Sequence, residues 1–151
     1  PIEGQVAVAN CSRIAGVSLV PADAEPVPEA IDAIAGADQV VIGPGSLFTS
    51  LLAVMAVPAI REALAATPAR KVYVCNLRQQ LPETSGYDVA AHVEALEAHG
   101  VHVDTVVSDP DGLLVGDVPD GITSIRAPVS RGPGIAHDPQ KLADALESLV
   151  G

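Results

Sequence analysis

The segment 40–50 carries the residues best suited to hold a phosphorylated ligand. Three β-forming residues run into a Gly-Pro-Gly turn, and two hydroxyl residues follow at the start of an apolar helical pattern. This order predicts a buried parallel strand whose carboxyl end opens into a loop and a helix, where open α/β sheets bind ligands. Glycine lets the main chain approach a ligand, and free N–H groups at a helix start favour anions. The candidate phosphate-binding residues are Gly43, Gly45, Ser46 and Thr49.

The loop matches neither of the common nucleotide-binding motifs. No Gly-Lys-Ser/Thr follows the turn, and Phe48 stands where the third glycine of a dinucleotide fingerprint would be. The alternative interpretation is an ordinary strand-to-helix turn in which Ser46 is the helix N-cap.

A second polar loop follows the β-forming run 72–75 and has the same strand-end position. Amide side chains there can read a base or a sugar, and an arginine can pair with a phosphate. A carboxylate can accept from sugar hydroxyls or hold a metal. The candidate ligand-binding residues of this loop are Asn76, Arg78, Gln80, Glu83, Thr84 and Tyr87. For Thr84 the alternative role is the N-cap of the next helix, and for Asn76 it is a turn that fixes its own backbone.

Other titratable residues indicate no catalytic arrangement. His92 and His99 are seven residues apart, which is not the spacing of a zinc-binding helix. No Ser-His-Asp order and no pair of catalytic carboxylates stands out. The sequence therefore favours ligand binding over turnover, and we expect no catalytic residue and no protein-held metal.

Composition limits the class of protein. The 151 residues are 48% hydrophobic, with a net charge of −11, which predicts one globular domain and opposes binding to nucleic acid or anionic membranes. No apolar run reaches the roughly 20 residues of a membrane span. Cys11 and Cys75 are expected to be buried free thiols in a reducing compartment, so we expect a cytoplasmic protein.

The order of elements predicts an α/β fold, Rossmann-like and doubly wound, with a mostly parallel sheet and helices on both faces. Strands are expected at 5–9, 13–20, 39–42, 71–75, 103–107 and 122–129. Helices are expected at 28–35, 47–55, from 58 to about 67, 87–99 and from 139 onward. Loops are expected at 109–121 and 130–134.

Two motifs resemble a known family. The run Ile42-Gly43-Pro44-Gly45-Ser46-Leu47-Phe48-Thr49-Ser50 is similar to the GPGSLYTS segment of YvcK-type gluconeogenesis factors, in the CofD-like superfamily. The run Val72-Tyr73-Val74-Cys75-Asn76, with Gln80, Glu83-Thr84 and Gly86-Tyr87 after it, resembles that family's second motif. The alanine- and valine-rich sequence resembles most the actinobacterial members of the family. The likeness also includes His137-Asp138-Pro139 before a helix.

The resemblance implies a domain organisation and a ligand. Residues 1–151 would be the C-terminal portion of a longer α/β domain whose Gly-rich N-terminal half is absent, and that half would be a partner of this chain. The resemblance further implies binding of a UDP-sugar such as UDP-N-acetylglucosamine by a regulator that links gluconeogenesis to cell-wall precursors and cell shape. The alternative is a magnesium-dependent transferase that moves 2-phospholactate to a deazaflavin. A homodimer remains open.

The sequence departs from the family's motifs at positions that bear on ligand binding. Leu81-Pro82 replaces Pro-Gly, and Ala136 stands where many relatives have a basic residue. If that basic residue contacts phosphate, either Arg131 replaces it as a ligand-binding residue or binding is weaker. His137 precedes a helix start and is a further candidate to bind an anion, with a role in the turn as the alternative.

Overall fold

Four short runs rich in β-forming residues make one parallel sheet. The computed structural model describes residues 1–132 and 136–150. Its strands are β1 (Gln39–Ile42), β2 (Arg70–Val74), β3 (Thr105–Ser108) and β4 (Thr123–Arg126), in the order β1-β2-β3-β4. All three pairings are parallel. The predicted α/β class and parallel sheet are confirmed; β1 has the predicted ends, and the ends of the other three strands differ from the prediction by one to three residues.

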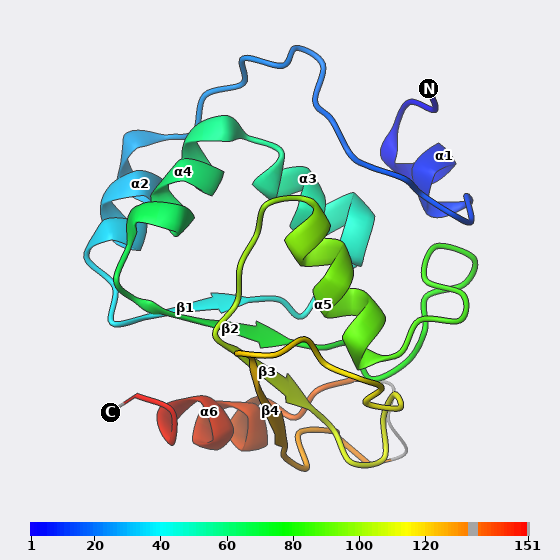
Figure 1. Cartoon of the computed structure of the whole chain (residues 1–151), viewed down its shortest axis with the longest axis vertical. Helices are drawn as coiled ribbons and strands as arrows, with labels where there is room; N and C mark the ends of the chain where they lie inside the picture. The colour runs from blue at the N-terminus through cyan, green and yellow to red at the C-terminus, as the bar shows by residue number, and fades with distance from the viewer. Residues whose placement is uncertain (133–135, 151) are drawn as a thin grey trace.

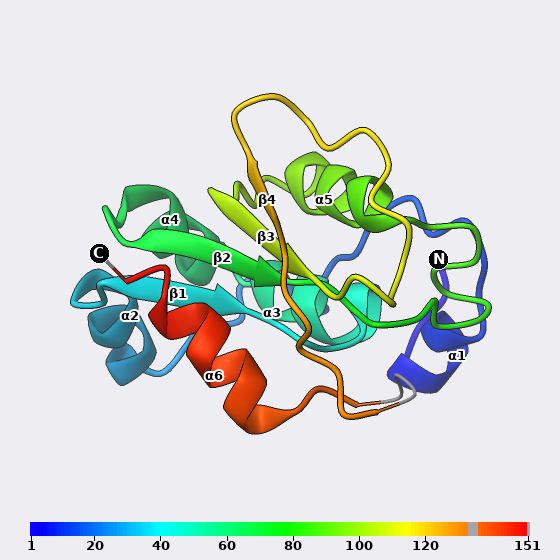
Figure 2. The same ribbon diagram turned by 90° about the horizontal axis from the view of Figure 1, so that it is seen from below.

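Helices cover both faces of this sheet, as Figures 1 and 2 show. Alternate residues of one strand point to opposite faces, so Tyr73 packs in the larger core and Val72 in the smaller one. The larger core lies under five helical elements, and the smaller core lies under α6 alone. The elements of the first layer are α2 (Pro28–Ala35), η1 (Leu47–Leu51), α3 (Leu52–Met55), α4 (Pro58–Ala66) and α5 (Val89–Ala98); α6 spans Pro139–Glu147.

The predicted N-terminal strands are wrong. Gln5–Ala9 forms a short helix, α1, and residues 13–20 have no regular structure. The alternation of apolar residues suited a strand, but a strand needs a neighbour to complete its hydrogen bonds. In the structure α1 closes its bonds locally, with Val8 N–H donating to the Gly4 carbonyl at 3.0 Å. No residue of α1 is buried.

Helix starts follow local sequence signals, with one correction. Pro28, Pro58 and Pro139 each occupy the first turn of a helix, and Asp138 accepts hydrogen bonds as the N-cap of α6. Thr84 is not the cap of α5. The chain turns at Gly86, with φ of +83°, and the cap is Asp88, whose carboxylate accepts from Ala91 N–H at 2.8 Å.

The predicted helix 47–55 starts with unusually wide turns. Both Ser50 N–H and Leu51 N–H donate to the Ser46 carbonyl, at 3.1 and 3.0 Å, and the second bond spans five residues. Ser46 precedes the helix as predicted, but its hydroxyl makes no capping bond. π-Helical turns are rare in proteins, and many of those that occur lie at functional sites.

β1 lies at an edge of the sheet. Among the described strands it pairs only with β2, so the main chain along its other side has no strand partner. Its sequence, Gln-Val-Val-Ile, carries no charge, and Val41 is 41% exposed.

No single described helix is long and apolar enough to cross a membrane. Taken together, the helices Leu47–Met55 and Pro58–Ala66 have the length and composition of a membrane span, but the chain bends by 77° between them. Leu47, Phe48, Leu52 and Leu64 of this pair are buried in the larger core. The expected loop 130–134 extends into residues 133 and 134, which lie outside the described residues.

Candidate ligand-binding site

The two polar loops predicted from the sequence meet at one edge of the sheet. Each follows the carboxyl end of a strand, and β1 and β2 are parallel neighbours. Gln80 Nε2 donates to Ser46 Oγ at 3.0 Å, and Asn76 Nδ2 donates to Gln80 Oε1 at 3.1 Å. This chain of side-chain hydrogen bonds fixes the amide groups of the second loop against the hydroxyl of the first.

A buried carboxylate occupies the start of the helical segment after the first loop. Glu83 is 4% exposed, and its Oε1 accepts from Phe48 N–H at 2.8 Å. Thr49 Oγ1 donates to Glu83 Oε2 at 3.4 Å. The protein itself therefore supplies an anion to one of the N–H groups that the sequence assigned to phosphate. The N–H groups of Gly45 and Ser46 have no hydrogen-bond partner among residues 1–132 and 136–150.

The first loop depends on a glycine at its bend. Gly43 has φ of +89°, and a Cβ there would lie 2.9 Å from the Val74 carbonyl oxygen. Only glycine allows this close passage of the β1 loop over the end of β2. Gly45 has no such restriction, since a Cβ there would first meet the Leu51 side chain at 3.4 Å.

The two loops border a cavity of about 310 Å³. This volume is at the lower end of the roughly 300–1,000 Å³ typical of ligand pockets. Its walls combine main chain from the first loop with amide, guanidinium and imidazole side chains. The lining residues are Pro44, Gly45, Asn76, Leu77, Arg78, Gln79, Gln80 and His137.

The end of β3 also contributes polar groups to this edge of the sheet. Asp109 is 4% exposed, and its carboxylate accepts from Ser130 N–H at 2.7 Å and Asp111 N–H at 2.9 Å. Burial alone would raise the pKa of Asp109, but main-chain hydrogen bonds outweigh it and lower the pKa below 3.8. Asp109 therefore fixes, as an anion, the segment that carries His137, which pairs with Ser130 in a β-bridge.

His137 is a neutral polar group at the cavity. Burial lowers its pKa below 6.5, against the Cys75 carbonyl and the Asp109 carboxylate, which raise it. Its Nε2 is buried and has no hydrogen-bond partner among the described residues. Arg131 is exposed and does not line this cavity.

Three other candidate residues are held by contacts within the protein. Thr84 is fully buried, and its hydroxyl accepts from Gln80 N–H at 2.8 Å. Tyr87 stacks edge-on against Phe48, with ring centroids 6.2 Å apart, and against His92 at 5.5 Å. Direct ligand contact by Thr84, Glu83 and Tyr87 stays a prediction, whereas the hydrogen bonds of Thr84 and Glu83 and the ring contacts of Tyr87 show what these residues do in the fold.

The cysteines are free, as predicted. Cys75, at the end of β2, is buried, and burial raises its pKa to about 12. Its thiol is therefore protonated near neutral pH and is a poor nucleophile. Cys11 is only half-buried, contrary to the prediction.

The described residues bring together no group of three or more His, Cys, Asp or Glu side chains that could hold a metal ion. Magnesium is commonly bound through one or two carboxylates together with substrate phosphates. The carboxylates of Glu83 and Asp109 are already engaged by N–H groups. A magnesium ion would thus need ligand oxygens as well as protein oxygens here.

The role of Asp109–Asp111 was not predicted from the sequence, where 109–121 was expected only to be a loop. The signal that could have found it is the one used for the other two loops, because Asp109 directly follows β3. Pro44, Leu77 and Gln79 also line the cavity without having been predicted.

The fold and the site define an α/β protein with loop-borne polar groups at the carboxyl edge of a parallel sheet. The family model described as "2-phospho-L-lactate transferase CofD" matches residues 1–138. The chain therefore belongs to the CofD-like family, as its two motifs indicated.

Relatives with assigned names support the same family. A gluconeogenesis factor of Bacillus subtilis is 45% identical over 112 residues, which cover 73% of this chain and 34% of that protein. A Mycobacterium leprae protein that carries the same name provisionally is 37% identical over 160 residues, covering 98% of this chain and 45% of that protein. The chain thus spans between a third and a half of these relatives.

A solved structure shares the fold. The crystal structure of a UPF0052-family protein from Bacillus halodurans superposes with a TM-score of 0.81 at 31% identity. The match covers 95% of this chain and 54% of that one.

Proposed function

We propose that this chain forms part of a binding site for a nucleotide sugar of the UDP-N-acetylglucosamine kind, in a cytoplasmic regulator without turnover of its own. The regulator would link gluconeogenic carbon metabolism to cell-wall precursor synthesis and cell shape. The names of the relatives concern gluconeogenesis, and the proposal carries that role to this chain.

The contact between the two loops is the observation that carries the proposal. The Gln80–Ser46 hydrogen bond holds amide groups beside a bend whose Gly45 and Ser46 N–H groups have no partner among the described residues. A diphosphate would accept hydrogen bonds from these two N–H groups, and charge-assisted hydrogen bonds contribute about 1.5–3 kcal/mol each. Because the Ser46 hydroxyl accepts from Gln80, its own proton remains available to a phosphate oxygen.

The sugar or the base would lie against the amide side of the cavity. Asn76 and Gln80 keep donor and acceptor groups that their mutual bond does not use. His137 is neutral and suits a hydroxyl or carbonyl better than a phosphate. Arg78 is the exposed cation of the lining.

Calorimetric titration with UDP-N-acetylglucosamine tests this function. We expect saturable heat that UDP alone reproduces in part and N-acetylglucosamine alone does not. Gly45→Ala is expected to weaken binding by about tenfold or more, because the added methyl group keeps a phosphate from the main chain. Absence of heat at millimolar ligand would contradict the proposal.

The transferase is the second candidate because the matching family model bears that name. It requires sustained, magnesium-dependent transfer of a phospholactyl group to a deazaflavin. Product formation over many turnovers would favour the transferase and contradict the regulator. Heat of binding without product would support the regulator.

A further inference from the structure

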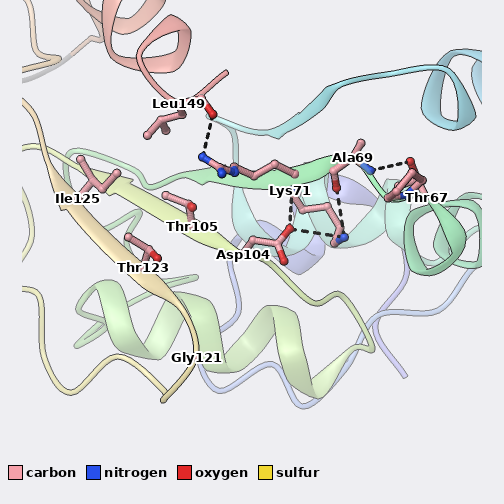
Figure 3. Close-up of a pocket in the computed structure, with 11 residues that line it drawn as sticks. Thr67, Ala69, Lys71, Asp104, Thr105, Gly121, Thr123, Ile125 and Leu149 are labelled. Carbon is pink, nitrogen blue, oxygen red and sulfur yellow. Dashed lines mark hydrogen bonds and ion pairs between the residues drawn. The ribbon is translucent and has the colours of Figure 1, made fainter. Parts of the chain in front are cut away.

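A second cavity, of about 590 Å³, lies at the opposite, amino-terminal edge of the sheet (Figure 3). It is bounded by the first residues of β2, β3 and β4 and by Leu149, just after α6. The proposed nucleotide-sugar site uses none of these residues, because that site lies at the carboxyl ends of the strands.

Three polar side chains from three different strands share one face of the sheet at this cavity. Thr105 is the register partner of Val72 in β2 and of Thr123 in β4, and Arg70 precedes Val72 by two residues. Because side chains alternate along a strand, Arg70, Thr105 and Thr123 all point to the α6 side. Ile125 and Leu149 add an apolar wall.

Arg70 brings to this face a positive charge that no ion pair of the described residues includes. Its Nη1 donates to the Leu149 carbonyl at 2.8 Å. The neighbouring Lys71 differs, because its Nζ lies 3.5 Å from Asp104 Oδ2 and donates to the Ala69 carbonyl at 3.3 Å. The planar guanidinium of Arg70 therefore retains donors that suit two oxygens of one anion.

Thr105 supplies a hydroxyl at the cavity wall that no described residue bonds. The residue is only 4% exposed and lines the cavity, yet its Oγ1 makes no hydrogen bond to any described residue. Its Oγ1 is not one of the fully buried polar atoms without a partner, so the oxygen is open to water or to a ligand in the cavity. By contrast, the Thr67 hydroxyl in the same cavity is used twice, by the Ile34 carbonyl and by Ala69 N–H.

We propose that this cavity binds a small phosphate monoester that also carries hydroxyl groups, such as a sugar phosphate, as a second ligand site of the protein. Arg70 takes the phosphate oxygens. The Thr105 and Thr123 hydroxyls bond to the ester's hydroxyls, and its carbon skeleton lies against Ile125 and Leu149. The charge and the hydroxyl pair together select this class over a plain anion or a neutral polyol.

Titration of ¹⁵N-labelled protein with glycerol 3-phosphate, followed by two-dimensional NMR, tests the site. We expect saturable shifts of amides near residues 70, 105 and 123, weaker shifts with inorganic phosphate, and none with glycerol. Equal response to inorganic phosphate, or shifts spread over all cationic side chains, would overturn the proposal. Shifts confined to the 43–49 and 76–80 loops would do so too, and would assign the phosphate to the first site.

Variants separate this site from general charge effects. Arg70→Gln is expected to lower the affinity for glycerol 3-phosphate about tenfold or more, and Thr105→Val several-fold. Arg126→Gln is the matched control, since this exposed arginine also donates to a carbonyl, that of Pro110 at 2.7 Å. Thr105→Ser keeps the hydroxyl and should restore binding, which guards against a folding defect of the valine variant. Equal loss in the Arg70 and Arg126 variants would overturn the assignment.

Discussion

The side chain of Gln80 donates to the hydroxyl of Ser46 at 3.0 Å, and this bond joins the loops that follow β1 and β2. The same glutamine accepts from Asn76 and, through its main-chain N–H, donates to Thr84 Oγ1. Gln80 is thus the residue through which the first loop, the second loop and the buried turn beneath them are held together.

Gln80→Ala is expected to lower the free energy of unfolding by about 1–3 kcal/mol, because two side-chain hydrogen bonds are lost and each contributes about 0.5–1.5 kcal/mol net. It should weaken nucleotide-sugar binding more strongly, because the amide group and the position of Ser46 are lost together. Urea unfolding and calorimetry measure the two effects. Gln140→Ala is the control, since Gln140 Nε2 donates to Asp144 on the exposed surface of α6, and neither quantity should change there.

Glu83→Leu is expected to destabilise the protein by about 1–3 kcal/mol, because it leaves the buried Phe48 N–H without an acceptor. Glu83→Gln keeps an acceptor oxygen, so its loss should be about half as large. Urea unfolding curves check both values. Glu94→Leu, on the exposed side of α5, should stay within about 0.5 kcal/mol. A Glu83→Leu protein as stable as the Glu94→Leu protein would mean that the carboxylate is dispensable for the loop.

The two glycines of the first loop should respond differently to alanine. Gly43→Ala is expected to cost about 1–3 kcal/mol, since φ of +89° disfavours a side chain and the Cβ would press on the Val74 carbonyl. Gly45→Ala should change stability by less than about 1 kcal/mol. Thermal and urea unfolding of both variants measure the difference. Similar stability of the two proteins would show that the bend at Gly43 is not required.

Stability should fall as the pH is lowered through the range below 6.5. Burial lowers the pKa of His92 from 6.5, although the Asp88 carbonyl and the Asp88 and Glu83 carboxylates raise it. The unfolded chain therefore takes up this proton first. The free energy of unfolding then decreases with falling pH until the folded pKa is reached, at up to about 1.4 kcal/mol per pH unit. His137, also with a lowered pKa, acts in the same direction.

His92→Leu tests the origin of this pH dependence. His92 Nδ1 lies 2.7 Å from the Asp88 carbonyl, which only accepts, so Nδ1 carries the proton and Nε2 is the buried atom without a partner. The leucine variant should show a shallower decline between pH 7.5 and 5 in urea unfolding. An unchanged slope, or stability that rises as the pH falls, would contradict the assignment.

The sheet and the meeting of the two loops could be predicted from the sequence because the signals are local. Runs such as Val72–Val74 are too apolar to lie elsewhere than in a core, and parallel strands bring their carboxyl ends to one edge. The N-terminal strands could not be judged in this way. The alternation in Gln5–Ala9 fits a strand, but whether a neighbouring strand exists is not a local property.

The engagement of Glu83 could not be predicted for a related reason. Its partner Phe48 is 35 residues earlier in the chain, and only the three-dimensional arrangement shows that a carboxylate of one loop reaches the N–H of another. Thr84 likewise looked like a helix cap because the positive φ of Gly86, which delays the helix to Val89, is a tertiary outcome.

The uncharged outer side of β1 has a practical meaning for anyone who handles this chain. Natural sheets protect such borders with lysine, proline or a bulge, and Gln39–Ile42 has none of these. Concentrated samples would therefore be prone to molecule-to-molecule strand addition at this border, and Val41→Lys is the simplest way to discourage it. The relatives named above are longer than this chain, so solubility trials on this chain and on such a relative would not be equivalent experiments.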